Sequence, residues 1–195
     1  EITEAMLKYF ITRVQNRSRF FSPRVAIAVP SVITAVDKRA VYNSAERAGA
    51  RKVYLVEEPR AAGLGAGLPI EDAVASMVVD VGGGTTEVAV LSLADVVTSV
   101  SLRVAGDEMD TAIIRYLRKT YNIHVGQNSA EDIKIKSGSA FPLEKELEAT
   151  VKGRDMIGNL PRKVQITSEE IREALADTTQ QIVQGIKETL EKTSP

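Results

Sequence analysis

The sequence predicts an α/β fold, and three observations support this prediction. Two short apolar runs, residues 25–29 and 52–56, have the length and composition of buried parallel strands, and a helical pattern follows each of them. A glycine-rich turn at residues 82–86 separates two further apolar segments, which predicts a hairpin. A capping-box sequence begins a long amphipathic helix at Thr167. Strands that alternate with helices are typical of the α/β class.

The N-terminal part alternates helices and strands. Thr34 is suited to cap the second helix, and Gly49 lies just past the end of that helix. The predicted elements are a helix over residues 2–14, a strand over 25–29, a helix over about 35–48, a strand over 52–56 and an Ala/Gly-rich helix over about 60–66.

The C-terminal part contains two predicted hairpins and three helices. Its elements are strands over 77–81, 87–92 and 95–104, helices over 107–120 and 128–137, a second hairpin formed by 144–151 and 162–166, and a helix that begins at Thr167. The last helix has one apolar stripe, made of Ile171, Leu175, Ile182, Val183, Ile186 and Leu190.

Composition excludes several kinds of site. Lys+Arg 25 nearly balances Asp+Glu 26, so there is no basic footprint for nucleic acid. The chain has no cysteine, which excludes disulfides and thiolate metal sites, and its one histidine, His124, is too little for a histidine-rich metal site. No apolar run reaches the roughly 20 residues that span a bilayer.

The strongest chemical signal is the segment from Asp80 to Thr86. Gly82, Gly83 and Gly84 leave backbone N–H groups open to an anion, and Thr85 and Thr86 add hydroxyls. Asp80 ends an apolar strand, where a carboxylate is costly unless it binds a cation directly or through water. The segment therefore predicts a phosphate site, although an ordinary glycine-rich hairpin is the alternative.

Two acids form a second signal where the 52–56 strand meets the next helix. Glu57 and Glu58 precede Pro59, and an acid there can position a water for attack on phosphorus. Acids also favour helix N-termini for electrostatic reasons alone, and this simpler interpretation stays open.

Together these motifs resemble the MreB family, within the superfamily of actin, sugar kinases and heat-shock-chaperone ATPases. The resemblance covers essentially all 195 residues in order. It is carried by Val56-Glu57-Glu58-Pro59-x-Ala61-Ala62-x-x-Gly65-Ala66-Gly67-Leu68-Pro69, residues 77–90, Gly106-Asp107-Glu108-Met109-Asp110, and Ala130-Glu131-x-Ile133-Lys134 followed by Gly138-Ser139-Ala140.

The resemblance implies an actin-like ATPase fold, ribonuclease H-like and present in part, with a small α+β inserted subdomain. It divides the chain into the remainder of subdomain IA (1–67), the first part of IIA (68–106), an inserted IIB (107–166) and a IIA helix (167–195). It also implies that this chain is the central portion of a longer protein, so that the family's first phosphate loop and later adenosine loop lie outside it. On its own, the chain is then expected to bind ATP weakly or not at all.

The resemblance also implies roles for residues in binding ATP and Mg²⁺. Asp80 would hold Mg²⁺ through water, and Glu58 would polarise the attacking water. The turn, Gly82, Gly83, Gly84, Thr85 and Thr86, would bind the phosphates, with Thr85 also orienting the water. The adenosine side would be formed by Glu131, Asp132, Ile133 and Lys134. Three positions depart from the family pattern: Arg60, Ala105 and Asp132.

The function that the resemblance implies is a cytoskeletal ATPase that directs cell shape and cell-wall synthesis. It would be cytoplasmic and peripheral at the inner membrane, would assemble head to tail into paired protofilaments, and would meet cell-elongation proteins such as RodZ. Phe20 and Phe21, flanked by arginines, would contact the membrane, although they could instead pack on the core. A non-hydrolysing scaffold and a small-molecule kinase of the same superfamily remain the alternatives.

Overall fold

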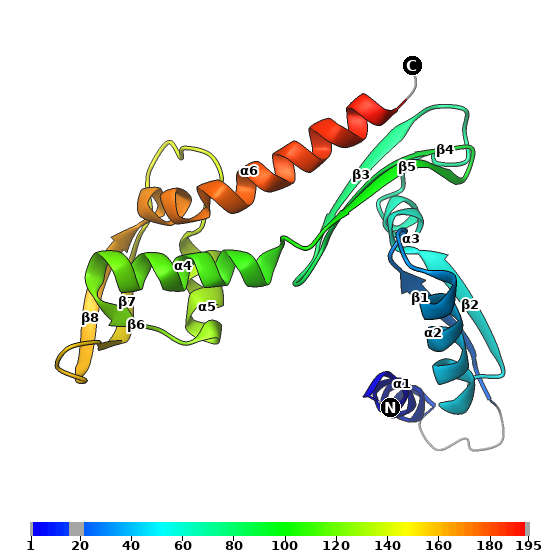
Figure 1. The fold of residues 1–195 in the computed structure, drawn as a ribbon, viewed down its shortest axis with the longest axis horizontal. Helices are drawn as coiled ribbons and strands as arrows, with labels where there is room; N and C mark the ends of the chain where they lie inside the picture. The colour runs from blue at the N-terminus through cyan, green and yellow to red at the C-terminus, as the bar shows by residue number, and fades with distance from the viewer. Residues whose placement is uncertain (1, 16–21, 194–195) are drawn as a thin grey trace. The chain divides into compact units, whose positions relative to one another are not determined.

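The computed structural model describes residues 2–15 and 22–193, which form two compact units (Figure 1). The first unit comprises residues 1–80, 87–101 and 192–195. The second comprises residues 81–86 and 102–191. The predicted contact loop at Phe20 and Phe21 lies outside the described residues.

The first unit contains the predicted parallel strand pair, but the predicted burial of these strands is wrong for this chain, because each has exposed residues and only one buried residue. In chain order its elements are α1 (Ile2–Val14), β1 (Arg24–Val29), α2 (Ala35–Arg47), β2 (Lys52–Glu57) and α3 (Glu58–Gly65), followed by β3 (Ser76–Val81), β4 (Thr86–Ser92) and β5 (Asp95–Leu102), whose outermost residues belong to the second unit. Strands β1 and β2 pair in parallel, with Arg24 opposite Lys52 and Val29 opposite Glu57. Helix α2 makes the crossover between them.

The predicted ends of α2 are confirmed. Thr34 accepts a hydrogen bond from the Asp37 N–H at 3.1 Å, so its hydroxyl caps the first turn. Gly49 follows the helix with a φ of +106°, a conformation that side chains other than glycine rarely adopt.

Helix α3 packs closely against the sheet of order β3-β4-β5. A Cβ atom at Gly63 would lie only 2.8 Å from Leu91 Cδ1 and 3.0 Å from Ile70 Cγ2, so this approach requires glycine. Ile70, Val78 and Leu91 form the buried cluster beneath the helix. Glu58, the first residue of α3, lies close enough to Glu87 of β4 and Asp80 of β3 to interact with their charges.

Strand β3 was predicted as an apolar strand whose end would be costly for a carboxylate, but its second half is exposed. Val78 is buried, but Val79, Asp80 and Val81 are exposed in this chain. Strand β4 is buried along almost its whole length. The cost of desolvating a carboxylate therefore applies to Glu87 in β4 rather than to Asp80.

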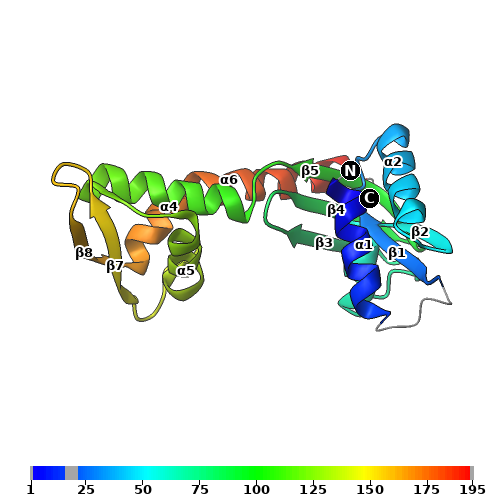
Figure 2. The same ribbon diagram turned by 90° about the horizontal axis from the view of Figure 1, so that it is seen from below.

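The second unit is an α+β body (Figure 2). Its elements are α4 (Gly106–Tyr121), β6 (Ile123–His124), α5 (Gln127–Ser137), β7 (Glu148–Asp155), β8 (Pro161–Thr167) and α6 (Ser168–Lys192). The strands form an antiparallel sheet of order β6-β7-β8. Its core consists of Ile113, Leu117, Ile123, Val125, Ala130, Ile133, Val151, Val164, Ile166, Ile171 and Leu175.

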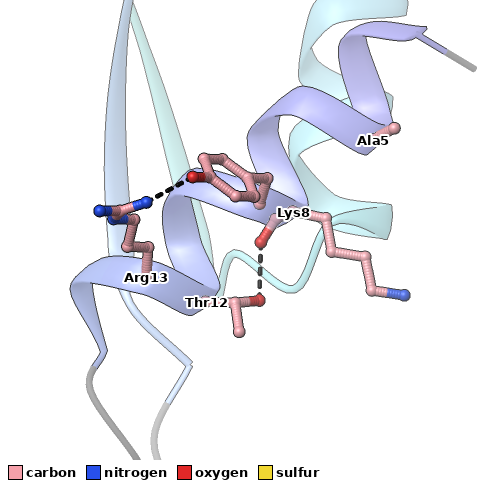
Figure 3. A pocket seen from close by; sticks show the side chains of 5 residues that line it. Ala5, Lys8, Thr12 and Arg13 are labelled. Carbon is pink, nitrogen blue, oxygen red and sulfur yellow. Dashed lines mark hydrogen bonds between the residues drawn. The ribbon is translucent and has the colours of Figure 1, made fainter.

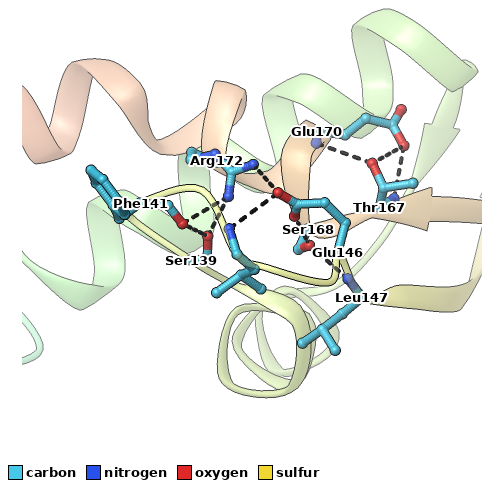
Figure 4. Close-up of polar contacts among 9 residues, drawn as sticks. Ser139, Phe141, Glu146, Leu147, Thr167, Ser168, Glu170 and Arg172 are labelled. Carbon is cyan, nitrogen blue, oxygen red and sulfur yellow. Dashed lines mark hydrogen bonds and ion pairs between the residues drawn. The ribbon is translucent and has the colours of Figure 1, made fainter.

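The second hairpin is confirmed, but its first strand begins at Glu148 rather than at residue 144. The residues before it form a loop that side chains of α6 hold in place (Figure 4). Arg172 donates hydrogen bonds to the Phe141 carbonyl at 2.9 Å and to Glu146 at 2.5 Å. The Leu147 N–H donates to Ser168 Oγ at 2.8 Å. Residues 141–147 are therefore held by side chains of α6 and not by backbone hydrogen bonds to a neighbouring strand.

Helix α6 begins with the predicted capping box. The Thr167 N–H donates to the Glu170 carboxylate at 2.8 Å, and the Glu170 N–H donates to Thr167 Oγ1 at 3.3 Å. The predicted stripe is right near the start of the helix, but Val183 and Leu190 are 42% and 55% exposed. Further along the helix, the buried positions include the small residues Gly185 and Thr189. Leu102 packs so closely here that a Cβ atom at Gly185 would lie 2.5 Å from its Cδ1 atom. No helix in the described ranges is long and apolar enough to cross a bilayer.

Candidate functional site

The glycine turn, residues 82–86, is closed by one hydrogen bond and supported by two more. The Gly82 N–H donates to the Thr85 carbonyl at 2.9 Å. The Gly82 carbonyl accepts from the Gly106 N–H at 3.1 Å, and the Gly83 carbonyl accepts from the Asp107 N–H at 2.8 Å. The N-terminus of α4 therefore fixes the position of the turn within the second unit.

The chain itself does not explain why residues 83 and 84 are glycine. None of the three glycines has the positive φ that favours glycine. A Cβ atom at Gly83 would meet only the Asp107 carboxylate, at 3.7 Å, and one at Gly84 would meet no described atom within 4 Å. All three glycines are exposed. The turn thus leaves room that side chains could fill, which suits close approach by a phosphate.

The two threonines of the turn have different surroundings. Thr86 is fully buried, and its hydroxyl donates to the Val104 carbonyl at 2.7 Å. Thr85 is only half-buried. Thr86 anchors the turn, so Thr85 is the threonine available to a ligand.

Three carboxylates gather in the first unit. Glu58 is half-buried at the start of α3, Asp80 is exposed near the end of β3, and Glu87 in β4 is 2% exposed. Burial raises the pKa of Glu58, and the negative charges of Glu87 and Asp80 raise it further. A positive charge bound here would relieve the repulsion among these groups.

The carboxylates do not form a direct metal cage. Among residues 2–15 and 22–193, no group of three acidic, histidine or cysteine side chains converges closely enough to hold an ion. A cation near Asp80 would therefore keep water or ligand oxygens in most of its coordination sphere, as Mg²⁺ usually does. The donor set fits a Mg²⁺ ion that arrives with phosphates.

Glu87 is a candidate site residue that was not predicted from the sequence. One of its carboxylate oxygens accepts from Ser101 Oγ at 2.5 Å, and no described donor reaches the other. The available signal was a glutamate directly before the apolar run Val88-Ala89-Val90-Leu91, in a segment predicted to be a strand. Burying such a carboxylate is costly unless a ligand supplies a hydrogen-bond donor or a cation.

The residues predicted for the adenosine side lie on α5 with different exposures. Glu131 and Asp132 are exposed, and Asp132 pairs with Lys136 at 3.5 Å. Ile133 is 8% exposed and packs in the core. Lys134 donates to the Gly106 carbonyl at 3.0 Å, so the structure brings it to the base of the glycine turn.

A separate hollow lies on α1 (Figure 3). Its polar groups pair along the same helix: Arg13 donates to the Tyr9 hydroxyl at 2.5 Å, and Thr12 donates to the Lys8 carbonyl at 2.7 Å. It contains none of the predicted site residues, and we assign it no role.

Comparison with known families identifies one match along the whole chain. The family model described as MreB/Mbl protein matches residues 1–195. The chain is 48% identical to the cell shape-determining protein Mbl of Bacillus cereus over 195 residues, which is 100% of this chain and 59% of that protein. It is also 48% identical to the cell shape-determining protein MreB of Escherichia coli K12, covering 100% of this chain and 56% of that protein.

Solved structures confirm the predicted actin-like fold. MreB5 of Spiroplasma citri bound to AMPPNP superposes with a TM-score of 0.92 at 38% identity, covering 98% of this chain and 58% of that chain. The same protein has been solved with ADP. The MamK double helical filament matches with a TM-score of 0.79 at 20% identity, covering 98% of this chain and 57% of the MamK chain, which shows the fold alone.

Proposed function

Because the chain belongs to the MreB/Mbl family, we propose that it forms the central part of an ATPase that polymerises at the membrane and determines cell shape. The relatives of this chain are cell shape-determining proteins, and a homologous structure holds an ATP analogue. The chain spans 56% and 59% of the length of the two relatives compared above, so activity is proposed for the complete protein.

The open glycine turn is the observation that carries the proposal. Its backbone has room for a phosphate at Gly83 and Gly84, and Thr85 is half-buried beside them. We propose that these three residues contact the β- and γ-phosphates of ATP. Backbone N–H groups held in place before the ligand arrives stabilise negative charge without reorganisation. Gly82 and Thr86 would set the turn's position rather than touch the nucleotide.

The carboxylates would supply the remaining chemistry. Asp80 would hold Mg²⁺ through water, and bound Mg²⁺ neutralises charge on the phosphates. Glu58 would accept a proton from the attacking water, since a raised pKa makes a carboxylate a better base near neutral pH. On α5, the exposed Glu131 and Asp132 would face the nucleoside. Ile133, which packs in the core, and Lys134, which donates to the Gly106 carbonyl, would hold α5 in place.

The cellular role rests on the family. Filaments built from head-to-tail contacts, attachment to the cytoplasmic face of the inner membrane and contact with elongation proteins such as RodZ are proposed from the resemblance. The loop with Phe20 and Phe21 would provide the membrane contact. Apolar side chains can enter the acyl boundary while neighbouring arginines meet anionic head groups.

A phosphate-release assay on the complete protein tests the proposal, with Glu57 as a matched control for Glu58. Glu57 ends β2 and Glu58 begins α3, and Glu57 pairs with Lys38 at 3.8 Å. We expect Glu58→Ala to lower the hydrolysis rate about 10²- to 10⁴-fold, the usual contribution of a general base, while ATP binding persists. Glu57→Ala should hydrolyse at close to the wild-type rate. Equal rates for Glu58→Ala and wild type would contradict the catalytic assignment, and an inactive wild type that binds ATP would favour the scaffold alternative.

A further inference from the structure

Apart from the N–H groups of Gly106 and Asp107 that support the glycine turn, the segment Gly106-Asp107-Glu108-Met109-Asp110 has no role in the site as proposed so far. We propose that Asp110 and Lys134 form a buried ion pair that holds the glycine turn in its phosphate-binding position. Both would be positioning residues that act through the backbone of Gly106. The inference rests on the proposed function, because it takes the turn to be a phosphate site.

The ion pair is short and largely shielded from solvent. Lys134 Nζ lies 2.8 Å from Asp110 Oδ1, with side-chain exposures of 20% and 4%. No other donor in the described part of the chain reaches Asp110 Oδ1. The same ammonium donates to the Gly106 carbonyl at 3.0 Å. Lys134 thus joins helix α5 to two points on the first turns of α4.

From Gly106 the connection continues into the glycine turn. The Gly106 N–H donates to the Gly82 carbonyl at 3.1 Å, and the next N–H, of Asp107, donates to the Gly83 carbonyl at 2.8 Å. The peptide group between Gly106 and Asp107 therefore accepts a hydrogen bond from Lys134 through its carbonyl and donates one to the turn through its N–H. All of these residues lie within the second unit.

The junction is tight for a side chain at residue 106. A Cβ atom there would lie 3.2 Å from Lys134 Nζ and 3.3 Å from the Gly82 carbonyl oxygen. Both neighbours are already fixed by hydrogen bonds, so neither can move without lengthening a contact. This explains glycine at 106, and the pairing with Lys134 explains an acid at 110.

The energetics of buried charge make the two residues act as a unit. A buried ion that loses its partner keeps the cost of desolvation without the compensating attraction. Removing either charge should therefore disturb Gly106 and the turn, and removing both should add little. If Lys134 instead contacted the adenosine directly, as the resemblance implies, removing Lys134 would weaken nucleotide binding and removing Asp110 would not.

The test uses the complete protein with Asp110→Asn, Lys134→Met and the double variant. The control is another ion pair of the second unit, Asp155 with Arg162 on strands β7 and β8, whose side chains are 19% and 49% exposed. Its variants are Asp155→Asn and Arg162→Met. Two quantities are measured: amide hydrogen exchange of the 104–109 segment without nucleotide, and affinities for AMPPNP and for AMP, which has no β- or γ-phosphate.

We expect each ion-pair variant to speed exchange at residues 106 and 107 and to weaken AMPPNP binding about 10- to 100-fold, as misplaced contacts do. AMP affinity should stay within about twofold, and the double variant should match the singles. The variants of the Asp155–Arg162 control pair should change neither affinity beyond about twofold. Equal losses for AMPPNP and AMP, unchanged exchange, or an effect of Lys134→Met without one of Asp110→Asn would overturn the inference.

Gly106→Ala provides a second route if the charge variants do not fold. It keeps both charges and adds one methyl group at the junction, so it should weaken AMPPNP binding and spare AMP; equal effects on both would also overturn the inference. Failure of the proposed function is distinguishable, because then wild-type protein would bind no AMPPNP while hydrogen exchange would still report the link to the turn.

Discussion

Three carboxylates close together define the site at the scale of single residues. The pKa of Glu58 is raised by burial and then by the charges of Glu87 and Asp80. Its folded-state pKa is thus above 4.5, the ordinary glutamate value, which applies when the chain is unfolded. Between those two values the folded protein binds the proton more tightly, so stability falls as pH rises through that window. At neutral pH the ionised Glu58 destabilises the nucleotide-free protein.

Replacing Glu58 with Gln should therefore stabilise the free protein at pH 7. After allowance for solvent screening we expect a gain on the order of 0.5 kcal/mol, measured by thermal unfolding across pH. The gain should disappear below the unfolded-state pKa, where both states are protonated. Glu57→Gln, which loses an ion pair with Lys38, should give no gain. A Glu58→Gln variant that is less stable at pH 7 would show that the charge is favourably held.

The sequence predicted the residues of the turn and Glu58 because their chemistry is local. Asp80 precedes a run of glycines and Glu58 precedes a proline, which is visible without a fold. Glu87 and the Asp110–Lys134 pair were missed, because their significance comes from burial and from a partner 24 positions away in the chain. The order of residues along α4 and α5 does not by itself reveal which of their charged side chains point into the protein.

At the scale of elements, helix caps were the most predictable features. The Thr34 cap and the Thr167–Glu170 box use hydrogen bonds between residues at most three apart. The start of β7 was wrong by four residues, because Glu146 is held by Arg172 of α6 instead of by a neighbouring strand. That contact crosses 26 residues of sequence. Element boundaries fail where such long-range side-chain bonds decide them.

The capping box gives a stability prediction for α6. Burial acts to raise the pKa of Glu170, but hydrogen bonds from Tyr121, from the Thr167 N–H and hydroxyl and from Tyr116 outweigh it, and the pKa is lowered. Its stabilisation is present above the unfolded pKa and is lost as pH falls through the lowered folded value.

Glu170→Gln should cost about 1 kcal/mol at pH 7, the usual size of a cap contribution, when measured by chemical denaturation. The cost should shrink as the pH is lowered below about 4.5, the ordinary glutamate value. Glu169→Gln, an exposed acid in the same turn, is the control and should change stability little. A pH-independent difference for Glu170→Gln would mean that lost packing, not charge, accounts for it.

At the scale of the whole molecule, the family resemblance predicted the actin-like fold, which periodicity alone did not. Local pattern supplied strands and helices, but many α/β arrangements satisfy the same order of elements. The division into 1–67, 68–106, 107–166 and 167–195 stays a prediction alongside the two compact units described here.

Membrane contact is the whole-molecule prediction that depends on Phe20 and Phe21. In the complete protein, Phe20→Ser with Phe21→Ser should reduce co-sedimentation with anionic liposomes about tenfold or more, because two large apolar side chains no longer enter the lipid. Phe10→Ser on α1, 54% exposed in this chain, is the control aromatic. Unchanged co-sedimentation of the double variant would remove the assignment.

The claim that the turn cradles nucleotide phosphates is tested most directly by one methyl group at Gly84. A Cβ atom there, like one at Gly65, meets no described atom within 4 Å, and neither residue has a positive φ. In the complete protein, both Gly84→Ala and Gly65→Ala should unfold at close to the wild-type temperature. Gly84→Ala alone should weaken AMPPNP binding, by about tenfold or more, because the methyl group occupies the phosphate's place. Wild-type affinity in Gly84→Ala would contradict the phosphate site and the ATPase built on it.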